Sequence, residues 1–224
     1  MAASLPVSRL SRQADRLILA TLLASVAMAL GLGAYYGQTG LALVVGVPLA
    51  LLGTMAALGS PGSLGTRLVL AAALMASVAL HIQLARGLIE MHFGVFVTLA
   101  FLLAYRDWRP LVMAAGVIAV HHVLFDRLQA AGLGTYCLTE PDLLRVFVHA
   151  GYVVAQTALE IYLATLMRRA ATQGDELTAL VDHLGSDGVI ALDVADLPAR
   201  THGAAGLQKA LLSLGRVLQT VGGS

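Results

Sequence analysis

The chain of 224 residues carries a formal net charge of +1, and 58% of its residues are hydrophobic while only 12% are charged. Soluble domains contain about 25% charged residues, so this composition, with a mean hydropathy of +0.81, predicts an integral membrane protein. No basic run indicates a nucleic-acid partner. The single cysteine, Cys137, excludes an intramolecular disulfide framework and any zinc site built from several cysteines.

Six apolar segments approach the roughly 17–20 residues that a helix needs to span a bilayer. They cover residues 17–36, 41–58, 67–85, 90–105, 111–125 and 143–167. The first apolar run is longer than the core of a signal peptide, so we expect a retained first helix. Residues 1–167 are therefore predicted to form an all-α bundle of six transmembrane helices in the lipid bilayer.

Basic residues indicate how this bundle is oriented. In the six-helix arrangement eight arginines fall on one side of the membrane, and they are Arg9, Arg12, Arg16, Arg67, Arg106, Arg109, Arg168 and Arg169. Positively charged loops face the cytoplasm. We therefore expect a multi-pass protein whose two termini are both cytoplasmic.

The composition changes after Met167, and residues 168–224 read as a separate cytoplasmic segment. A polar helix over 168–184 is followed by an extended connector, GSDGVIALDVADLPARTHG. A second helix then carries apolar residues at 4-3-4-3 spacing, namely Leu207, Leu211, Leu214, Leu218 and Val221. This spacing is typical of a coiled coil, so we predict a parallel helix pair that buries its apolar positions by forming a homodimer. The coiled-coil pattern stops at VGGS, and we expect an output domain to follow it in a longer chain.

Five of the seven histidines lie in or beside the predicted spans, and these are His81, His92, His121, His122 and His149. At about 1.5 Å of rise per residue, the first four lie ~17–21 Å above the cytoplasmic ends of their helices. His149 lies ~10 Å below the outer end of its longer helix. Four helices thus bring histidine to a similar depth in the outer half of the membrane.

A shared depth favours a metal or haem site. A lone buried histidine is usually hydrogen-bonded to a carbonyl or a hydroxyl, but polar groups in a bilayer are costly and commonly functional. A hydrogen-bonded or proton-sensing cluster without a metal is the alternative. Of the acidic residues only Glu90 is well placed to join the five histidines as a ligand, and no thiolate is expected among them.

The predicted ligands suit a transition metal, with copper or non-haem iron first because imidazole binds both. Five histidines exceed the needs of one tetrahedral ion, which suggests a dinuclear site. Haem b ranks second because it needs only two histidines and would leave the other three unexplained.

Other polar residues accompany the histidines. Asp126 shares a helix face with His122, where it would either orient the imidazole or mark the helix end beside Arg127, and Arg86 would pair with Glu90. Tyr152, Gln156 and Glu160 continue from His149 at spacings of three and four. They form a polar stripe that either packs helices together or couples the site to the cytoplasmic segment.

The segment HIQLARGLIEMHFGVFVTLAFLLAYRDWRPLVMAAGVIAVHHVLF, residues 81–125, resembles the membrane sensor region of bacterial methyl-accepting chemotaxis proteins. The resemblance rests on its His, Glu-x-His, Tyr-Arg-Asp-Trp-Arg-Pro and His-His elements in combination. The stretch 168–221 is similar to a HAMP signal-relay module. The resemblance implies a homodimeric receptor in the bacterial inner membrane that controls a cytoplasmic kinase through a downstream module.

Taken together, the sequence predicts a transmembrane sensor rather than an enzyme. The histidine-rich metal site would respond to a small ligand, to redox state or to the metal itself, and the HAMP-like pair would relay the change. A membrane metalloenzyme resembling an oxidase and a metal-free pH or quinone sensor are the alternatives.

Overall fold

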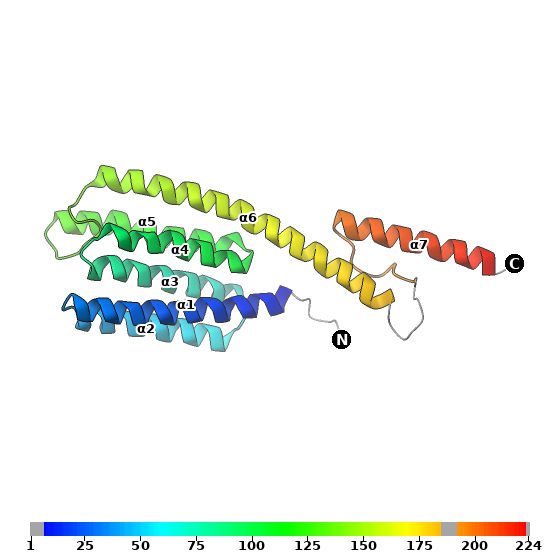
Figure 1. Ribbon diagram of the computed structural model, residues 1–224, viewed down its shortest axis with the longest axis horizontal. Helices are drawn as coiled ribbons and strands as arrows, with labels where there is room; N and C mark the ends of the chain where they lie inside the picture. Colours follow the sequence, from blue (N-terminus) through cyan, green and yellow to red (C-terminus); the bar gives the residue numbers. More distant parts are fainter. Residues whose placement is uncertain (1–6, 185–191, 223–224) are drawn as a thin grey trace. The chain divides into compact units, whose positions relative to one another are not determined.

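The computed structural model describes residues 7–184 and 192–222, and every regular element in these ranges is helical. The elements in chain order are α1 Val7–Tyr35, α2 Thr39–Gly59, α3 Leu64–Leu84, the 3-10 helix η1 Ile89–His92, α4 Phe93–Leu102, the 3-10 helix η2 Leu103–Tyr105, α5 Trp108–Ala130, α6 Leu143–Leu184 and α7 His202–Gly222. The chain divides into two compact units, one spanning Ser8–Thr165 and the other containing the described residues from Leu166 onward. We call them the bundle unit and the relay unit (Figure 1).

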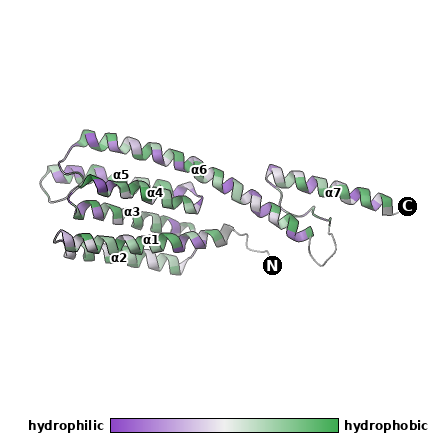
Figure 2. Cartoon of the chain, in the orientation of Figure 1, coloured by the Kyte–Doolittle hydropathy of each residue, from purple (hydrophilic) through white to green (hydrophobic). Residues whose placement is uncertain are grey.

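Five helices are long and apolar enough to cross a membrane: α1, α2, α3, α5 and α6. The prediction of an all-α membrane protein agrees with this finding. The fourth predicted span, residues 90–105, corresponds to the shorter apolar segment formed by η1, α4 and η2. Figure 2 shows hydrophobic residues along most of the bundle helices, as a lipid-facing surface requires.

Polar contacts join the helix ends of the bundle unit into two sets. At one end Arg67 pairs with Asp107 at 2.7 Å, and the Gly62 amide donates to Asp15. At the other end Gln38 donates to the Leu84 carbonyl. Successive helices therefore run in alternating directions, and the segment from Ile89 to Tyr105 connects the two ends.

Helix α3 lies at the centre of the bundle unit. It packs against α2, α4 and α5, and Leu70, Leu74 and Met75 on it are almost fully buried in the main apolar core. Its first turn is capped by Ser63, whose hydroxyl accepts a hydrogen bond from the Thr66 amide. The central position of α3 fixes the polar residues at its far end, His81 and Gln83, beside the turns at that end of the bundle.

Helix α6 continues without a break from the bundle unit into the relay unit. The predicted change at Met167 is thus a change of composition inside one helix. In the relay unit Leu180, Val194 and Ala204 form a small apolar core, and α7 runs in the same direction as the last turns of α6 (Figure 1). The first part of the predicted connector, residues 185–191, lies outside the described residues.

The predicted coiled-coil positions divide into two groups. Leu207 and Leu211 pack against the core of the relay unit, whereas Leu214, Leu218 and Val221 are exposed. The described part of the connector lies against α7, where the side chain of Gln208 donates hydrogen bonds to the carbonyls of Val194 and Leu197. The exposed group leaves an apolar stripe on the C-terminal half of α7.

Glu176 joins the start of α7 to α6, and this contact predicts a pH dependence. Its carboxylate accepts hydrogen bonds from the Thr201 hydroxyl at 2.6 Å and the Thr201 amide at 2.8 Å, which lower the pKa of Glu176. A lowered pKa stabilises the folded relay unit above the ordinary value of 4.5, and this stabilisation disappears as the pH falls through the folded-state pKa. We expect a spin label on exposed Val217 to become more mobile as the pH falls below about 4.5. The Glu176→Gln variant should lose most of this dependence, and equal pH profiles for the two proteins would contradict the assignment.

Candidate metal centre

Four of the five predicted histidines meet in the bundle unit, and we call them the histidine cluster. His92 comes from η1, His121 and His122 from α5, and His149 from α6. The ring centroid of His92 lies 5.3 Å from that of His122 and 5.2 Å from that of His149. The ring centroids of His121 and His122 are 5.3 Å apart. Three helical segments, η1, α5 and α6, thus bring four of the five predicted histidines together, whereas the sequence predicted that four helices would contribute.

Backbone carbonyls set the orientation of two of these rings. The Nδ1–H of His92 donates to the Leu88 carbonyl at 3.2 Å, and that of His122 donates to the Ile118 carbonyl at 2.9 Å. In a neutral imidazole this leaves Nε2 as a lone-pair donor. The Nε2 atoms of His92 and His121 are buried without a hydrogen-bond partner. Buried polar atoms rarely lack a partner, and a bound ion is one explanation for such atoms.

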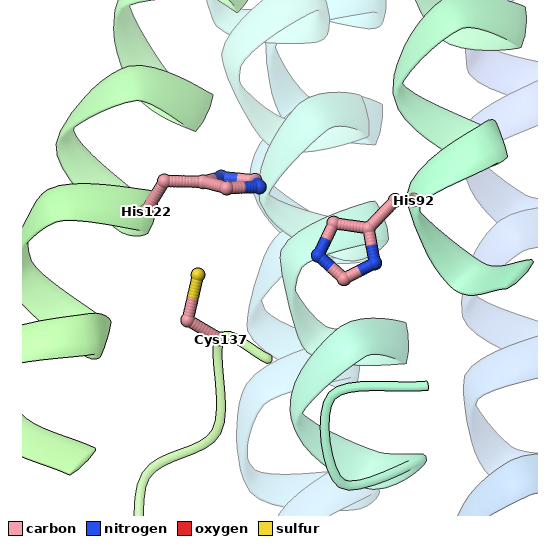
Figure 3. A group of neighbouring side chains, drawn as sticks. All are labelled: His92, His122 and Cys137. Atoms are coloured by element: carbon pink, nitrogen blue, oxygen red, sulfur yellow. The ribbon is translucent and has the colours of Figure 1, made fainter. Parts of the chain in front are cut away.

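Cys137 completes this arrangement, and here the sequence-based expectation was wrong. No thiolate was expected near the histidines, yet one ligand atom each of His92, His122 and Cys137 lie within 4.8 Å of one another, and all three side chains are buried. In Figure 3 the sulfur points toward the space between the two rings. Bonds of about 2.0–2.3 Å to a tetrahedral ion would require these atoms to approach by roughly 1 Å.

Two glutamines position the loop that carries Cys137. The side-chain oxygen of Gln129 on α5 accepts a hydrogen bond from the Cys137 amide at 2.9 Å, and its nitrogen donates to the Leu138 carbonyl at 2.7 Å. Gln83 on α3 accepts from the Tyr136 amide at 2.7 Å. Polar side chains at helix ends satisfy loop amides that would otherwise be buried unpaired, so the loop is held against the bundle.

The turn before η1 fits closely beneath this loop. Gly87 has a positive φ of 78°, and a Cβ there would overlap the backbone of Leu138. Only glycine combines that conformation with so close an approach. The turn, the loop and the start of η1 therefore form one packed layer that brings Cys137 to His92.

Burial, and then the charge of Asp126, raise the pKa of the Cys137 thiol to about 12. The buried site therefore favours the neutral thiol when no cation lies beside the sulfur. A cation next to the sulfur would favour the thiolate instead, so metal binding here would release a proton.

The remaining predicted ligands, His81 and Glu90, lie elsewhere. His81 is buried on α3, where its Nε2–H donates to the Ser25 carbonyl at 2.8 Å. Glu90 is exposed on η1. Both line a separate cavity between α1, α3 and the η1–α4 segment. His81 and Glu90 were predicted at a depth similar to that of the histidine cluster, but their side chains face a different side of the bundle unit.

The predicted neighbours of the histidines also have other roles. The Asp126 carboxylate accepts a hydrogen bond from the Asp142 amide at 2.8 Å and pairs with Arg127. It thus anchors the start of α6, while His122 is oriented by Ile118. Arg86 has a positive φ of 54° in the turn after α3, and within the described part of the chain it forms no ion pair with Glu90.

The polar stripe on α6 is only partly directed inward. Tyr152 is 68% exposed and so faces outward from the bundle unit. Glu160 is buried and accepts a hydrogen bond from Gln156, while its second carboxylate oxygen has no partner. The inward-facing part of the polar stripe therefore reduces to His149, Gln156 and Glu160.

A cavity of about 470 Å³ between α5 and α6 reaches the cluster. His122 and His149 line one part of it, and most of the other lining side chains are aliphatic. An apolar cavity beside a group of imidazoles is a setting in which a small apolar molecule can approach them.

Comparisons with known proteins return no matching family model, no matching curated protein and no matching solved structure. The functional assignment therefore depends on the residues of this chain.

Proposed function

We propose that this chain is the membrane part of a bacterial sensor related to chemoreceptors, and that it binds one transition-metal ion through His92, His122 and Cys137. The observation that supports this most is the approach of three buried donor atoms to within 4.8 Å. The Nδ1 hydrogens of both imidazoles are engaged by carbonyls, which is the usual outer support of a metal-bound histidine.

The donor set favours copper or zinc, and we propose copper because zinc has no redox chemistry through which a site could report redox state. Thiolate ligands select copper and zinc, and imidazole suits both. The presence of Cys137 changes the earlier preference, because a donor set without sulfur left non-haem iron equally suitable. His121 and His149 lie next to the three ligands, where either side chain can supply a fourth donor.

In this proposal a stimulus changes the coordination of the ion and thereby the position of α6. His149 lies on α6 beside His92, and α6 continues into the relay unit. A ligand that binds two arrangements with different affinity shifts their populations. The apolar cavity between α5 and α6 suits a small apolar stimulus such as a dissolved gas.

The rest of the proposal follows the resemblance. The chain acts as a homodimer in the bacterial inner membrane with both termini in the cytoplasm, and a HAMP-like relay passes the signal to a kinase-control module. The exposed stripe of Leu214, Leu218 and Val221 on α7 supports pairing with a second copy. The protein is then a receptor without turnover of its own.

Elemental analysis of the purified full chain tests the metal site. We expect about one copper ion per chain, and replacing both His92 and His122 by alanine should reduce the content to background because two of three ligands are lost. His81→Ala is the matched control, since His81 lies outside the cluster, and it should retain the metal. Metal-free wild-type protein, or equal contents in the wild type and the double variant, would contradict the proposal, and a Soret band would show haem instead.

A further inference from the structure

A second cavity, of about 290 Å³, lies between α1, α3 and the η1–α4 segment and is separate from the metal centre. Its polar lining residues include Ser25, His81 and Glu90 at the end of the bundle where η1 begins. Farther along, Leu74, Val97 and Phe101 line it with apolar surface. The cavity is thus amphipathic along its length.

The hydrogen bonds of the polar lining determine what it offers a ligand. His81 donates its Nε2–H to the Ser25 carbonyl, so the Nδ1 of the neutral ring is an acceptor. The Ser77 hydroxyl donates to the Leu74 carbonyl, so in its 2.7 Å contact with Ser25 it accepts. The Ser25 hydroxyl hydrogen is thereby used. One lone pair of its oxygen faces the His81 Nε2–H at 3.4 Å, and the other remains an acceptor.

Glu90 adds a negative charge to this set of acceptors. Its side chain is exposed, and within the described residues no arginine forms an ion pair with it. A carboxylate accepts hydrogen bonds and cannot donate them. The complementary head group carries a positive charge and several N–H donors, and the apolar remainder of the cavity suits an alkyl chain.

We propose that this cavity binds a single-chain primary ammonium amphiphile, whose ammonium group pairs with Glu90 and donates to His81 and Ser25 while its chain extends toward Phe101. A primary alkylamine stays protonated at pH 7.5, as a lysine side chain with a pKa of about 10.4 does. A quaternary ammonium ion has the same charge but no N–H donor, so it should bind more weakly. The proposal does not depend on the metal centre.

Binding of radiolabelled decylammonium to the full chain in phosphatidylcholine nanodiscs tests this inference, with empty nanodiscs subtracted as the blank. We expect saturable binding with one site per chain. Glu90→Gln should lower the affinity at least about tenfold, because it removes a charge-assisted hydrogen bond. Competition by decyltrimethylammonium should require at least about ten times more ligand than competition by unlabelled decylammonium.

Two further variants separate this site from its surroundings. Glu90→Asp keeps the charge on an exposed side chain and should retain most of the affinity. Cys137→Ser alters the proposed metal centre and should leave amine binding unchanged. Amine binding and metal content are measured separately, so one proposal can fail without the other. Binding that does not saturate, an unaffected Glu90→Gln variant, or equal competition by the quaternary ion would each overturn the inference.

Discussion

Replacing Gly87 by alanine is expected to lower the free energy of unfolding by about 2–4 kcal/mol, because the new Cβ combines a strained positive φ with overpacking. The methyl group would overlap the backbone of Leu138 and displace the loop that holds Cys137. We expect the apparent Tm of the detergent-solubilised protein to fall by on the order of 10 °C, and the metal content to fall with it. Thermal stability can be followed by the loss of the monodisperse peak in size-exclusion chromatography.

Gly132→Ala is the matched control for this experiment. Gly132 also has a positive φ, of 75°, but a Cβ there meets no atom within 4 Å. Its replacement should cost about 1 kcal/mol for the backbone conformation alone and leave the metal content unchanged. Equal effects at the two positions would show that the contact between Gly87 and Leu138 is unimportant.

Replacing Cys137 by serine should weaken copper binding by at least about a hundredfold. Loss of a hydrogen-bonding partner behind a metal ligand already costs about 10–100-fold in affinity, and serine removes the thiolate itself. If copper is bound as Cu(II), the same substitution should abolish the intense visible absorption of the copper–thiolate bond. Competition with a chelator of known affinity measures the first effect, and absorption spectroscopy measures the second.

The serine variant is nearly isosteric, so its fold provides an internal control. The amide of Cys137 rather than its side chain holds the loop to Gln129, and this bond is retained. We therefore expect a Tm close to that of the wild-type protein without metal. An unchanged copper affinity would remove Cys137 from the site and leave the histidine cluster as the only source of ligands.

The helices of the bundle unit were largely predictable because hydropathy reports directly on burial in lipid. Predicted and observed segments agree within a few residues at α2 and α3. Met167, the predicted end of the sixth span, lies inside α6, which continues to Leu184. No glycine or proline follows Met167 closely, so a change from apolar to polar residues alters the surroundings of the helix without ending it.

For the candidate metal centre, the sequence predicts how far along its helix each histidine lies, but not the direction in which its side chain points. Rise per residue places His81 and His92 at similar heights, but the rotation of each helix about its own axis decides which cavity a side chain faces. Cys137 was missed because a loop has no periodicity from which its position follows. Gln83 and Gln129, two amides near the ends of apolar helices, were a signal that loop backbone would fold back against the bundle.

The two 3-10 turns of the segment Ile89–Tyr105 bear on the bilayer thickness that this segment would have to match in the predicted six-span arrangement. A 3-10 turn rises about 2.0 Å per residue against about 1.5 Å in an α-helix, so η1, α4 and η2 together extend about 29 Å rather than about 26 Å. The longer value is close to the roughly 30 Å hydrocarbon thickness that the segment would have to match. A thinner bilayer would favour the shorter α-helical form of this segment over the longer 3-10 form. The conversion would involve η1, which carries His92. Hydrophobic mismatch would then act directly on a proposed metal ligand, and lipid chain length becomes an experimental variable for the proposed sensor.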